Sequence, residues 1–304
     1  MAILTTSSAY HELADATNAA AHHLTKILPR NILPDSATKV APTIALLSDS
    51  TLDLLLCLLG LIRAGFAVLL LAPQCDSTAI SHLLHTTRAR ALFYSVHLTA
   101  TALNIPSALP TLPLPAFSLG KIAARGTYPI PGFINSDSTG YIHHTSGTAS
   151  GLPKPVPQPH AAATVQLPSI PTVPRVATLT TTPLYHGGVA DLMRSMMSHS
   201  MIWFFPPSVP VTAANVVRAV RAGDAALGKE GVRVRLFTGV PYVQKVCAED
   251  AECVEVLKGM DMVGVGGARL EEVVGDFLVE RGVRLVSRFG SSECGCRFPI
   301  RVGE

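Results

Sequence analysis

The sequence predicts a layered α/β fold, with mostly parallel sheets and helices packed on both faces. Two continuous apolar runs, TIALLS at residues 43–48 and FAVLLLA at residues 66–72, have the length of buried strands. Apolar runs without alternation are typical of strands that are covered on both faces, as in parallel sheets. Strand and helix patterns also alternate along the chain, which indicates βαβ units. Because 48% of the 304 residues are hydrophobic, the chain can bury a large core.

The individual elements follow from these runs and from the signals at their ends. The helix expected over residues 51–64 has three candidate N-cap residues, at positions 49–51, and Gly65 follows its last turn. The proline-rich stretch 105–115 is expected to be an extended connector, and a second proline cluster covers residues 153–174. The strand candidates are residues 43–48, 66–71, 91–94, 140–143, 177–181, 201–205, 235–238, 262–265 and 284–288. The helix candidates are residues 10–28, 51–64, 77–87, 213–227, 241–249 and 270–281.

One stretch, residues 52–73, is apolar enough and long enough to cross a bilayer, which takes about 20 residues. However, Asp53 and Arg63 lie within it and Gly65 divides it. We therefore expect a helix followed by a parallel strand, and no membrane span.

Charge and cysteine content argue against several other classes of protein. The formal net charge is +3, and the basic residues do not cluster as they do in nucleic-acid binders. The six cysteines form no CxxC pair, and the N-terminus lacks the layout of a signal peptide. We therefore expect free thiols in a reducing, cytoplasmic setting.

The first candidate for chemistry is a loop in residues 141–154, which read YIHHTSGTASGLPK. Small residues let backbone N–H groups approach phosphate oxygens, hydroxyl groups add donors and a lysine adds positive charge. The spacing is not that of a Walker A loop. Taken alone, the composition is more typical of a flexible turn. The candidate phosphate-binding residues are Thr145, Ser146, Gly147, Thr148, Ser150, Gly151 and Lys154.

A second candidate lies in residues 180–188, which read TTTPLYHGG and follow a predicted strand. Ligands in α/β folds bind at the carboxyl ends of strands. His186 is therefore a candidate pocket residue, and Gly187 and Gly188 would let a ligand approach the backbone. The alternative is a packed turn that is merely capped by Tyr185 and His186.

Two later segments, VGVGGA at 263–268 and RFGSSECG at 288–295, each follow a β-like apolar run. On the second, Ser291, Ser292 and Glu293 place two hydroxyl groups and a carboxylate on one short loop. Hard oxygen ligands of this kind suit Mg²⁺, which binds through one or two carboxylates together with substrate phosphates. Taken alone, Glu293 is more often a solvated surface carboxylate.

Two histidine pairs, at residues 22–23 and 143–144, have no acidic or cysteine partner at metal-ligand spacing. We therefore expect them to be structural. The chain also has no GxSxG nucleophile elbow and no GxGxxG dinucleotide motif.

In combination, these motifs are more informative than each is alone. The order TSGT…GLPK, PLYHGG, GGA and FGSSE resembles the motif series of the adenylate-forming superfamily of AMP-dependent synthetases and ligases. That superfamily includes acyl-CoA synthetases, adenylation domains of nonribosomal peptide synthetases (NRPS) and luciferases. The run LLGLIRAGFAVLLLAP is similar to the family's early helix–strand segment. The VPYV segment and the proline after LPK are most similar to the adenylation domains of fungal NRPS-like carboxylate reductases.

The resemblance implies a role for each matched residue. The loop over residues 145–154 would bind the phosphates of ATP, His186 would lie at the acyl pocket, and Glu293 would hold Mg²⁺. His186 and Glu293 are thus the candidate catalytic residues. The residues that would flank the nucleotide and the substrate are Gly266, Gly267, Ala268, Phe289, Gly290, Ser291 and Ser292.

The sequence also departs from the family pattern. TSGTASGLPK carries one residue more than the usual TSGTTGLPK, and residues 294–304 no longer resemble the family. The resemblance implies an incomplete N-terminal adenylation subdomain over residues 1–304. The C-terminal subdomain, which carries the catalytic lysine in the family, would be absent. We therefore expect impaired catalysis.

The activity implied by the resemblance is the ATP- and Mg²⁺-dependent activation of a carboxylic acid to an acyl-adenylate. PLYHGG is similar to the loops of acyl- and aryl-acid activators, so an aryl or fatty acid is favoured over an amino acid. The expected partners are this small-molecule acid and carrier or reductase domains of a longer protein, with no nucleic acid. The alternative is a non-catalytic remnant that binds a nucleotide, an acyl group or a partner protein.

Overall fold

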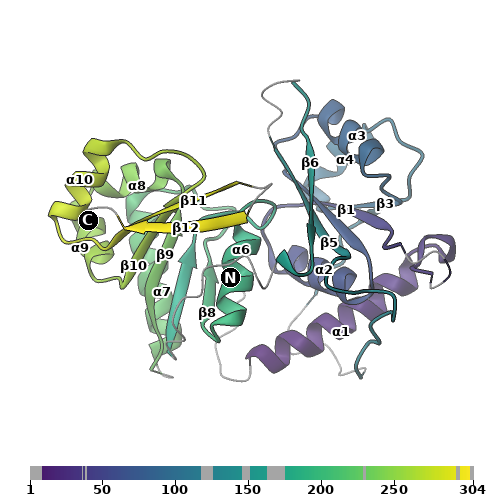
Figure 1. Ribbon diagram of the computed structural model, residues 1–304, viewed down its shortest axis with the longest axis horizontal. Helices are drawn as coiled ribbons and strands as arrows, with labels where there is room; N and C mark the ends of the chain where they lie inside the picture. Colours follow the sequence, from purple (N-terminus) through teal and green to yellow (C-terminus); the bar gives the residue numbers. More distant parts are fainter. Residues whose placement is uncertain are drawn as a thin grey trace. The chain divides into compact units, whose positions relative to one another are not determined.

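The computed structural model describes residues 9–35, 37, 40–117, 126–145, 151–162, 175–228, 231–291 and 295–301. The chain divides into two compact units. The N-terminal unit comprises Ser7–Ala162 and Leu184–His186, and the C-terminal unit comprises Met1–Thr6, Ala163–Pro183 and Gly187–Glu304. Each unit is an α/β layer structure, as the sequence predicts (Figure 1).

The N-terminal unit is built on a six-stranded sheet with the order β4-β3-β1-β2-β5-β6. Its strands are β1 (Thr43–Leu47), β2 (Ala67–Leu71), β3 (Ala91–Tyr94), β4 (Thr111–Pro113), β5 (Thr139–His144) and β6 (Pro155–Pro159). The first five strands are mutually parallel, and only β6 runs antiparallel to its neighbour. Every residue of β1, β2 and β3 is buried, which explains why these strands read as continuous apolar runs.

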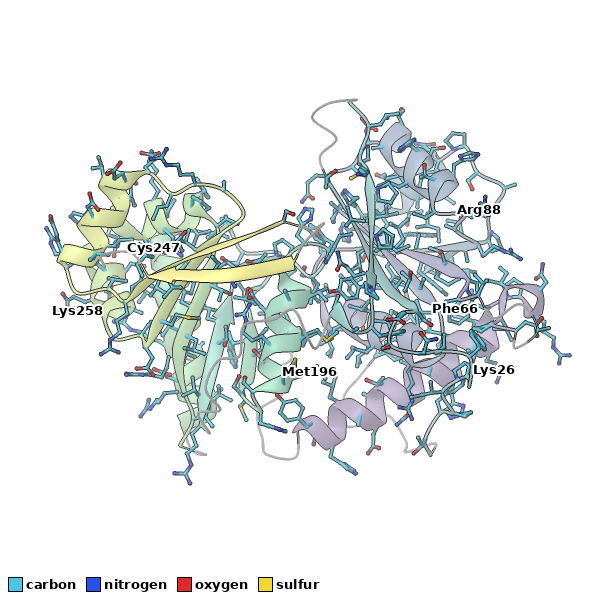
Figure 2. The ribbon with its side chains drawn as sticks, in the orientation of Figure 1. Lys26, Phe66, Arg88, Met196, Cys247 and Lys258 are labelled. Carbon is cyan, nitrogen blue, oxygen red and sulfur yellow. The ribbon has the colours of Figure 1, made fainter. Side chains whose placement is uncertain are left out.

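Helices cover both faces of this sheet. They are α1 (Ala9–Ile27), α2 (Leu52–Arg63), α3 (Ser77–Thr86) and α4 (Thr99–Leu103), with short 3₁₀ turns at Arg30–Ile32 and Val96–Leu98. Figure 1 shows α1 and α2 on one face and α3 and α4 on the other. Helix α1, which ends just after Lys26 (Figure 2), crosses α2 closely, since a Cβ atom at Gly60 would lie 2.8 Å from the Cβ of Ala20.

The apolar stretch 52–73 forms helix α2 followed by strand β2, as expected. The hydroxyl of Thr51 caps α2 by accepting from the backbone N–H of Leu54 at 3.2 Å. Gly65 ends it with a φ of +91°, a left-handed conformation that glycine adopts without strain. Phe66 then enters the strand fully buried (Figure 2). No helix within the described residues is long and apolar enough to cross a membrane.

Strand β6 was not predicted, because its sequence PVPQP contains three prolines. Thr145 donates its N–H to the carbonyl of Lys154 at 3.0 Å, which fixes the hydrogen-bonding register between β5 and β6. In that register the N–H groups of Val156 and Gln158 point toward β5, and Pro155 and Pro157 occupy the positions that need no donor. Prolines on the outer side of an edge strand also prevent pairing with another strand.

The C-terminal unit has a second six-stranded sheet, with the order β12-β11-β10-β9-β7-β8. Its strands are β7 (Val176–Thr180), β8 (Met201–Phe204), β9 (Arg233–Gly239), β10 (Met262–Gly266), β11 (Leu285–Ser291) and β12 (Gly295–Arg301). All pairs are parallel except β11 with β12. Both units therefore share one plan, a parallel sheet that is closed at one edge by an antiparallel strand.

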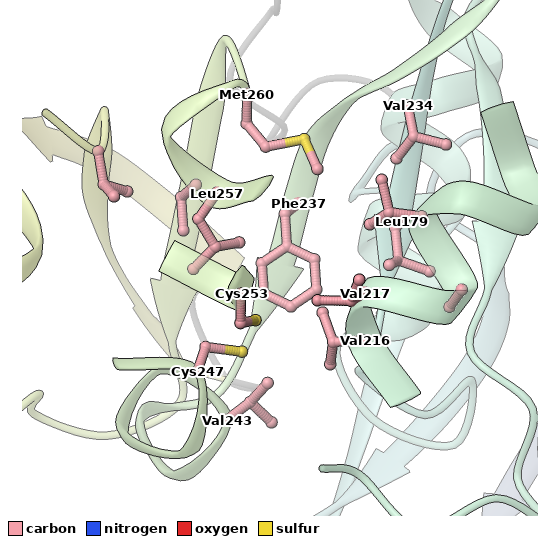
Figure 3. Close-up of a cluster of buried hydrophobic side chains, with 14 of the residues drawn as sticks. Leu179, Val216, Val217, Val234, Phe237, Val243, Cys247, Cys253, Leu257 and Met260 are labelled. Carbon is pink, nitrogen blue, oxygen red and sulfur yellow. The ribbon is translucent and has the colours of Figure 1, made fainter. Parts of the chain in front are cut away.

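The helices of this unit are α6 (Gly188–Met197), α7 (Ala213–Leu227), α8 (Pro241–Ala248), α9 (Ala251–Lys258) and α10 (Glu272–Glu280). Helices α7 to α10 contribute to one apolar cluster against the sheet, in which Phe237 packs among Leu179, Val216 and Val217 (Figure 3). Helix α6 lies on the opposite face, because Asp191 contacts Thr238, which neighbours Phe237 in the strand and points the other way.

The sequence interpretation missed α4, α6, α9 and three short or edge strands, β4, β6 and β12. Helix α6 begins at two glycines that read as a loop, and α9 follows α8 after only two residues. Residues 295–301, in which no element was expected, form β12 although Pro299 lies within it, because β12 is an edge strand.

Candidate functional site

The carboxyl ends of the parallel strands in the N-terminal unit carry polar side chains. Ser48 follows β1 and Ser95 follows β3, and their hydroxyl oxygens lie 2.6 Å apart. Thr145 follows β5 and begins the hydroxyl-rich loop. Because these strands are parallel, their carboxyl ends share one edge of the sheet, the edge at which α/β proteins bind ligands.

Two buried histidines end strand β5 at this edge. The Nδ1 atom of His143 donates to the carbonyl oxygen of Tyr185 at 3.3 Å, and the Nε2 atom of His144 accepts from the N–H of Ala72 at 3.1 Å. Burial lowers the pKa of His143 to about 4 and also lowers the pKa of His144. Both rings are therefore neutral near pH 7, and each partner fixes the tautomer of its ring.

These contacts hold the segment Leu184–His186 on the N-terminal unit. The N–H of Leu184 donates to the hydroxyl of Ser50 at 2.7 Å, just after β1. The amide of Gln74, just after β2, donates to the hydroxyl of Tyr185 at 3.4 Å. Together with His143 at the end of β5, three strand ends thus fix one three-residue segment.

The fixed segment leaves His186 exposed at the sheet edge. Its ring centroid lies 5.7 Å from that of His144 and 5.0 Å from that of Tyr185, both in edge-to-face arrangements. Partial desolvation by these neighbours lowers the pKa of His186, so that its imidazole is neutral near pH 7. Tyr185 thus packs, as in the alternative of a packed turn, whereas His186 is exposed. That His186 lines a ligand pocket stays a prediction.

The two glycines after His186 allow close packing against the preceding turn. A Cβ atom at Gly188 would lie 2.4 Å from the carbonyl oxygen of Thr182, so only glycine fits at the start of α6. At Gly187 a Cβ atom would lie 3.2 Å from the methyl group of Thr182. The prediction that Gly188 leaves backbone space for a ligand is therefore wrong, because the preceding turn occupies that space.

The hydroxyl-rich loop spans the hairpin between β5 and β6. Thr145 and Lys154 pair at its base, and the Lys154 side chain is exposed. Gly151 has a φ of +72°. Apart from the glycine itself and its two chain neighbours, no atom of the described residues lies within 4 Å of the position a Cβ would take. The predicted residues Ser146, Gly147, Thr148 and Ser150 lie outside the described residues.

The remaining predicted residues lie in the C-terminal unit. Gly266 ends β10, and Gly267 and Ala268 follow it, exposed, with Gly267 at a φ of +90°. Phe289, Gly290 and Ser291 were expected on a loop after a strand ending at Arg288. They instead belong to β11, because pairing with β12 extends that strand to Ser291. Ser292 and Glu293, the predicted magnesium ligand, lie outside the described residues.

The C-terminal unit also contains a charged cluster that the sequence did not reveal. Asp191 on α6 accepts from Arg194 at 2.7 Å and from Arg288 at 2.8 Å. Its second oxygen accepts from the hydroxyls of Thr180 and Thr238, at 2.8 Å and 2.7 Å. Burial alone would raise the pKa of Asp191, but Arg288 and Arg194 hold it well below its ordinary value.

Such a cluster can be found only from the structure, because its members come from α6, β7, β9 and β11, and only Asp191 and Arg194 are close in the sequence. Within the part of the chain that the structure describes, no group of three or more histidine, cysteine, aspartate or glutamate side chains could hold a metal ion. Thr145, Lys154 and His186 thus gather in one unit, and the Gly266 and Gly290 segments in the other.

The chain belongs to the AMP-binding enzyme family, whose sequence profile matches residues 4–301. The match includes residues 295–301, which were not expected to resemble the family. The fold agrees: the N-terminal subdomain of Klebsiella oxytoca NpsA superposes with a TM-score of 0.75 at 18% identity, covering 96% of this chain and 70% of that chain. The same subdomain in complex with 3-hydroxyanthranilyl-AMSN gives a TM-score of 0.74 at 18% identity, over 97% of this chain and 70% of that chain.

The curated relatives are fungal. The chain is 28% identical over 280 residues to the adenylate-forming reductase stbB of Stachybotrys bisbyi, covering 86% of this chain and 25% of the relative. It is 27% identical over 286 residues to an adenylate-forming reductase of Aspergillus terreus, covering 88% of this chain and 26% of the relative. The chain thus spans about a quarter of the length of the curated relatives that it matches.

Proposed function

We propose that this chain binds ATP and a carboxylic acid and contributes to the activation of that acid as an acyl-adenylate. The observation that carries the proposal is the fixed segment Leu184–His186. Three strand ends hold it so that a neutral, exposed imidazole stands at the ligand-binding edge of a parallel sheet. Membership of the AMP-binding family and the names of the adenylate-forming relatives support the same reaction class.

In this reaction a carboxylate oxygen of the acid forms a bond to the α-phosphorus of ATP. The bond from that phosphorus to the bridging oxygen breaks, and pyrophosphate leaves with the electron pair. The protein positions the two reactants and stabilises charge on the phosphates. The hydroxyl-rich loop, with its exposed Lys154, fits the phosphates, and Glu293 would hold Mg²⁺, which neutralises phosphate charge when it is bound.

His186 is proposed to contact the acid rather than the phosphates. A neutral imidazole can donate or accept a hydrogen bond without adding charge beside the reacting carboxylate. An aryl or fatty acid without an α-amino group is the proposed substrate class. Asp191 cannot hold an α-ammonium, because its oxygens already accept four hydrogen bonds.

The names of the relatives, which include adenylate-forming reductases, support a place for this sequence in a longer protein with a reductase domain. Carrier domains and a cytoplasmic location are part of the same proposal. In that proposal the 304 residues supply an N-terminal adenylation subdomain, and efficient turnover needs the lysine of a second subdomain. Binding without turnover is the second candidate function. The extra residue in TSGTASGLPK favours it, since it changes the length of the phosphate loop.

Calorimetric titration of the chain with ATP and Mg²⁺, and with a non-hydrolysable aryl-adenylate analogue, tests the proposal. Lys154→Ala should weaken ATP binding by about 1.5–3 kcal/mol, the cost of losing a charged hydrogen bond. Lys26→Ala is the matched control, because Lys26 is an exposed lysine at the end of α1 (Figure 2). Equal ATP affinities of the two variants would rule out the phosphate-loop assignment.

ATP–pyrophosphate exchange with aryl, fatty and amino acids separates the two candidate functions. We expect weak binding of ATP and negligible exchange for residues 1–304 alone. Robust exchange with an acid would show that this chain suffices for turnover. No binding of ATP or of the adenylate analogue would contradict both candidates.

A further inference from the structure

The charged cluster in the C-terminal unit is not electrically balanced. The side chains of Asp191, Arg194 and Arg288 are only 1%, 5% and 14% exposed. Among the described residues, Asp191 is the only carboxylate that pairs with either guanidinium group. Buried charges in proteins are normally paired with an opposite charge. Within the described residues, two arginines with one aspartate thus leave one positive charge without a carboxylate partner.

The hydrogen bonds show which of the two arginines has a buried donor without an acceptor. The carboxylate of Asp191 has about four lone-pair sites and accepts four hydrogen bonds, two of them from threonine hydroxyls. It can accept no more. The Nε–H group of Arg288 is buried, and within the described part of the chain it has no acceptor. A guanidinium group has five donors, so Arg288 can bind an oxyanion while it still contacts Asp191.

Strand β10 leaves room for this side chain. A Cβ atom at Gly264 would lie 3.1 Å from the Nε atom of Arg288, and one at Gly266 would lie 3.5 Å from its Cβ atom. The arginine therefore crosses β10 over two glycines. It starts beside the Gly266–Ala268 and Phe289–Ser291 segments and ends at α6, the helix that follows the PLYHGG motif. The first two segments are those that the sequence predicts to flank the nucleotide and the substrate.

We propose that Arg288 is a specificity-determining residue that binds a second carboxylate of the substrate acid, one that is not activated. This inference rests on the proposed function. The reacting carboxylate loses its own charge on adenylation, because the negative charge of the acyl-adenylate lies on its phosphate. That carboxylate therefore could not balance the cluster throughout the reaction. A second carboxylate keeps its charge throughout the reaction. The same positive charge repels the α-ammonium of an amino acid, which disfavours amino acids as substrates.

Equilibrium binding of matched acids to the full chain tests this inference. The probes are benzoate and benzene-1,3-dicarboxylate, each titrated calorimetrically with a non-hydrolysable ATP analogue and Mg²⁺ present. We expect wild type to bind the dicarboxylate at least about tenfold more tightly, as one charged hydrogen bond implies. Arg288→Met should weaken dicarboxylate binding by about 10- to 100-fold and benzoate binding by less than about threefold.

Two further variants distinguish recognition from a merely structural role. Arg288→Lys keeps the charge but loses the forked donors, so it should recover part of the dicarboxylate affinity. Arg218→Met, which removes an exposed arginine on α7, should change neither acid affinity. Arg288→Met should also keep the fold, because Asp191 and Arg194 remain as a one-to-one pair.

Several outcomes would overturn the inference. One is equal binding of the two acids by wild type. A second is an equal loss of affinity for both acids in Arg288→Met. A third is unfolding of that variant when wild type shows no preference for the dicarboxylate. The proposed function fails separately. Dicarboxylate preference without binding of ATP and Mg²⁺ would contradict adenylation and support Arg288 as an anion site, whereas ATP binding without that preference would overturn only the role of Arg288.

Discussion

The two units have the same sheet architecture but differ in the charge of their buried polar groups. Each has a parallel sheet with one antiparallel edge strand, and in each a polar group is buried on or beside that sheet. In the N-terminal unit the buried groups are neutral imidazoles, His143 and His144, bonded to backbone groups. In the C-terminal unit they are ions around Asp191.

This difference bears on the ligand that we propose for each unit. Neutral donors and acceptors fix a backbone segment without attracting ions, and they present His186 in a defined position. A buried ionic cluster with excess positive charge instead favours a negatively charged ligand. Four substitutions or conditions can break or sharpen this contrast.

The largest effect is expected from Asp191→Asn. It leaves two guanidinium groups without a carboxylate, and removing one partner of a buried ion pair typically costs about 3–5 kcal/mol. Urea unfolding followed by the fluorescence of Trp203, the single tryptophan, reports on this unit. Asp276→Asn, an exposed aspartate on α10, is the control and should change the free energy of unfolding by less than about 0.5 kcal/mol. A loss below about 1 kcal/mol for Asp191→Asn would show that the ionic cluster does not hold its unit together.

Acidification should destabilise the N-terminal unit at a higher pH than the C-terminal unit. The pKa of His143 is about 4 in the folded chain, below its ordinary value of 6.5. The unfolded chain therefore binds a proton first as the pH falls, and the N-terminal unit loses stability between about pH 6.5 and pH 4. The loss is at most about 3 kcal/mol, at 1.36 kcal/mol for each pKa unit. Asp191, whose pKa is lowered, loses its contribution only below its ordinary value of 3.8.

Hydrogen exchange can follow the two units separately over this range. Protection in β1 and β2 should decrease by pH 4.5, while Trp203 fluorescence still reports a folded C-terminal unit. His143→Gln should reduce the pH dependence, because glutamine does not titrate. Parallel loss of both units between pH 6.5 and pH 4.5, unchanged in His143→Gln, would contradict this assignment.

These contrasts also show which features of the structure could be predicted from the sequence. The buried parallel strands and their helices could be predicted, because apolar runs such as residues 43–48 and caps such as Thr51 are local signals. Strand β6 could not be predicted, since prolines argue against a strand unless the strand is known to lie at the edge of a sheet. His186 became a candidate site residue through its motif, and that role stays a prediction. The roles of Ser50, Gln74 and His143 in fixing it depend on contacts between distant strand ends.

The proline pattern of β6 can be tested by two neighbouring substitutions. Val156→Pro removes an N–H that points toward β5, which should cost about 1–3 kcal/mol for the unsatisfied buried acceptor. Pro157→Ala changes a position that needs no donor, so it should cost only about 0.4–1 kcal/mol, through the greater freedom of the unfolded chain. The free energies of unfolding from urea titrations decide between them. Equal costs would mean that the register deduced from Thr145 and Lys154 is wrong.

The smallest effect is expected from Ser50→Ala, which removes the acceptor for the N–H of Leu184. A neutral hydrogen bond contributes about 0.5–1.5 kcal/mol, far less than the ionic contacts of Asp191. Because Leu184 adjoins Tyr185 and His186, the variant should also weaken binding of the aryl-adenylate analogue, by more than its loss of stability explains. Tyr185→Phe is the matched control, since the hydrogen bond from Gln74 is long at 3.4 Å and its loss should cost less than about 0.5 kcal/mol. If Ser50→Ala leaves analogue binding unchanged while lowering stability, the strand-end contacts only hold the fold, and the position of His186 does not depend on them.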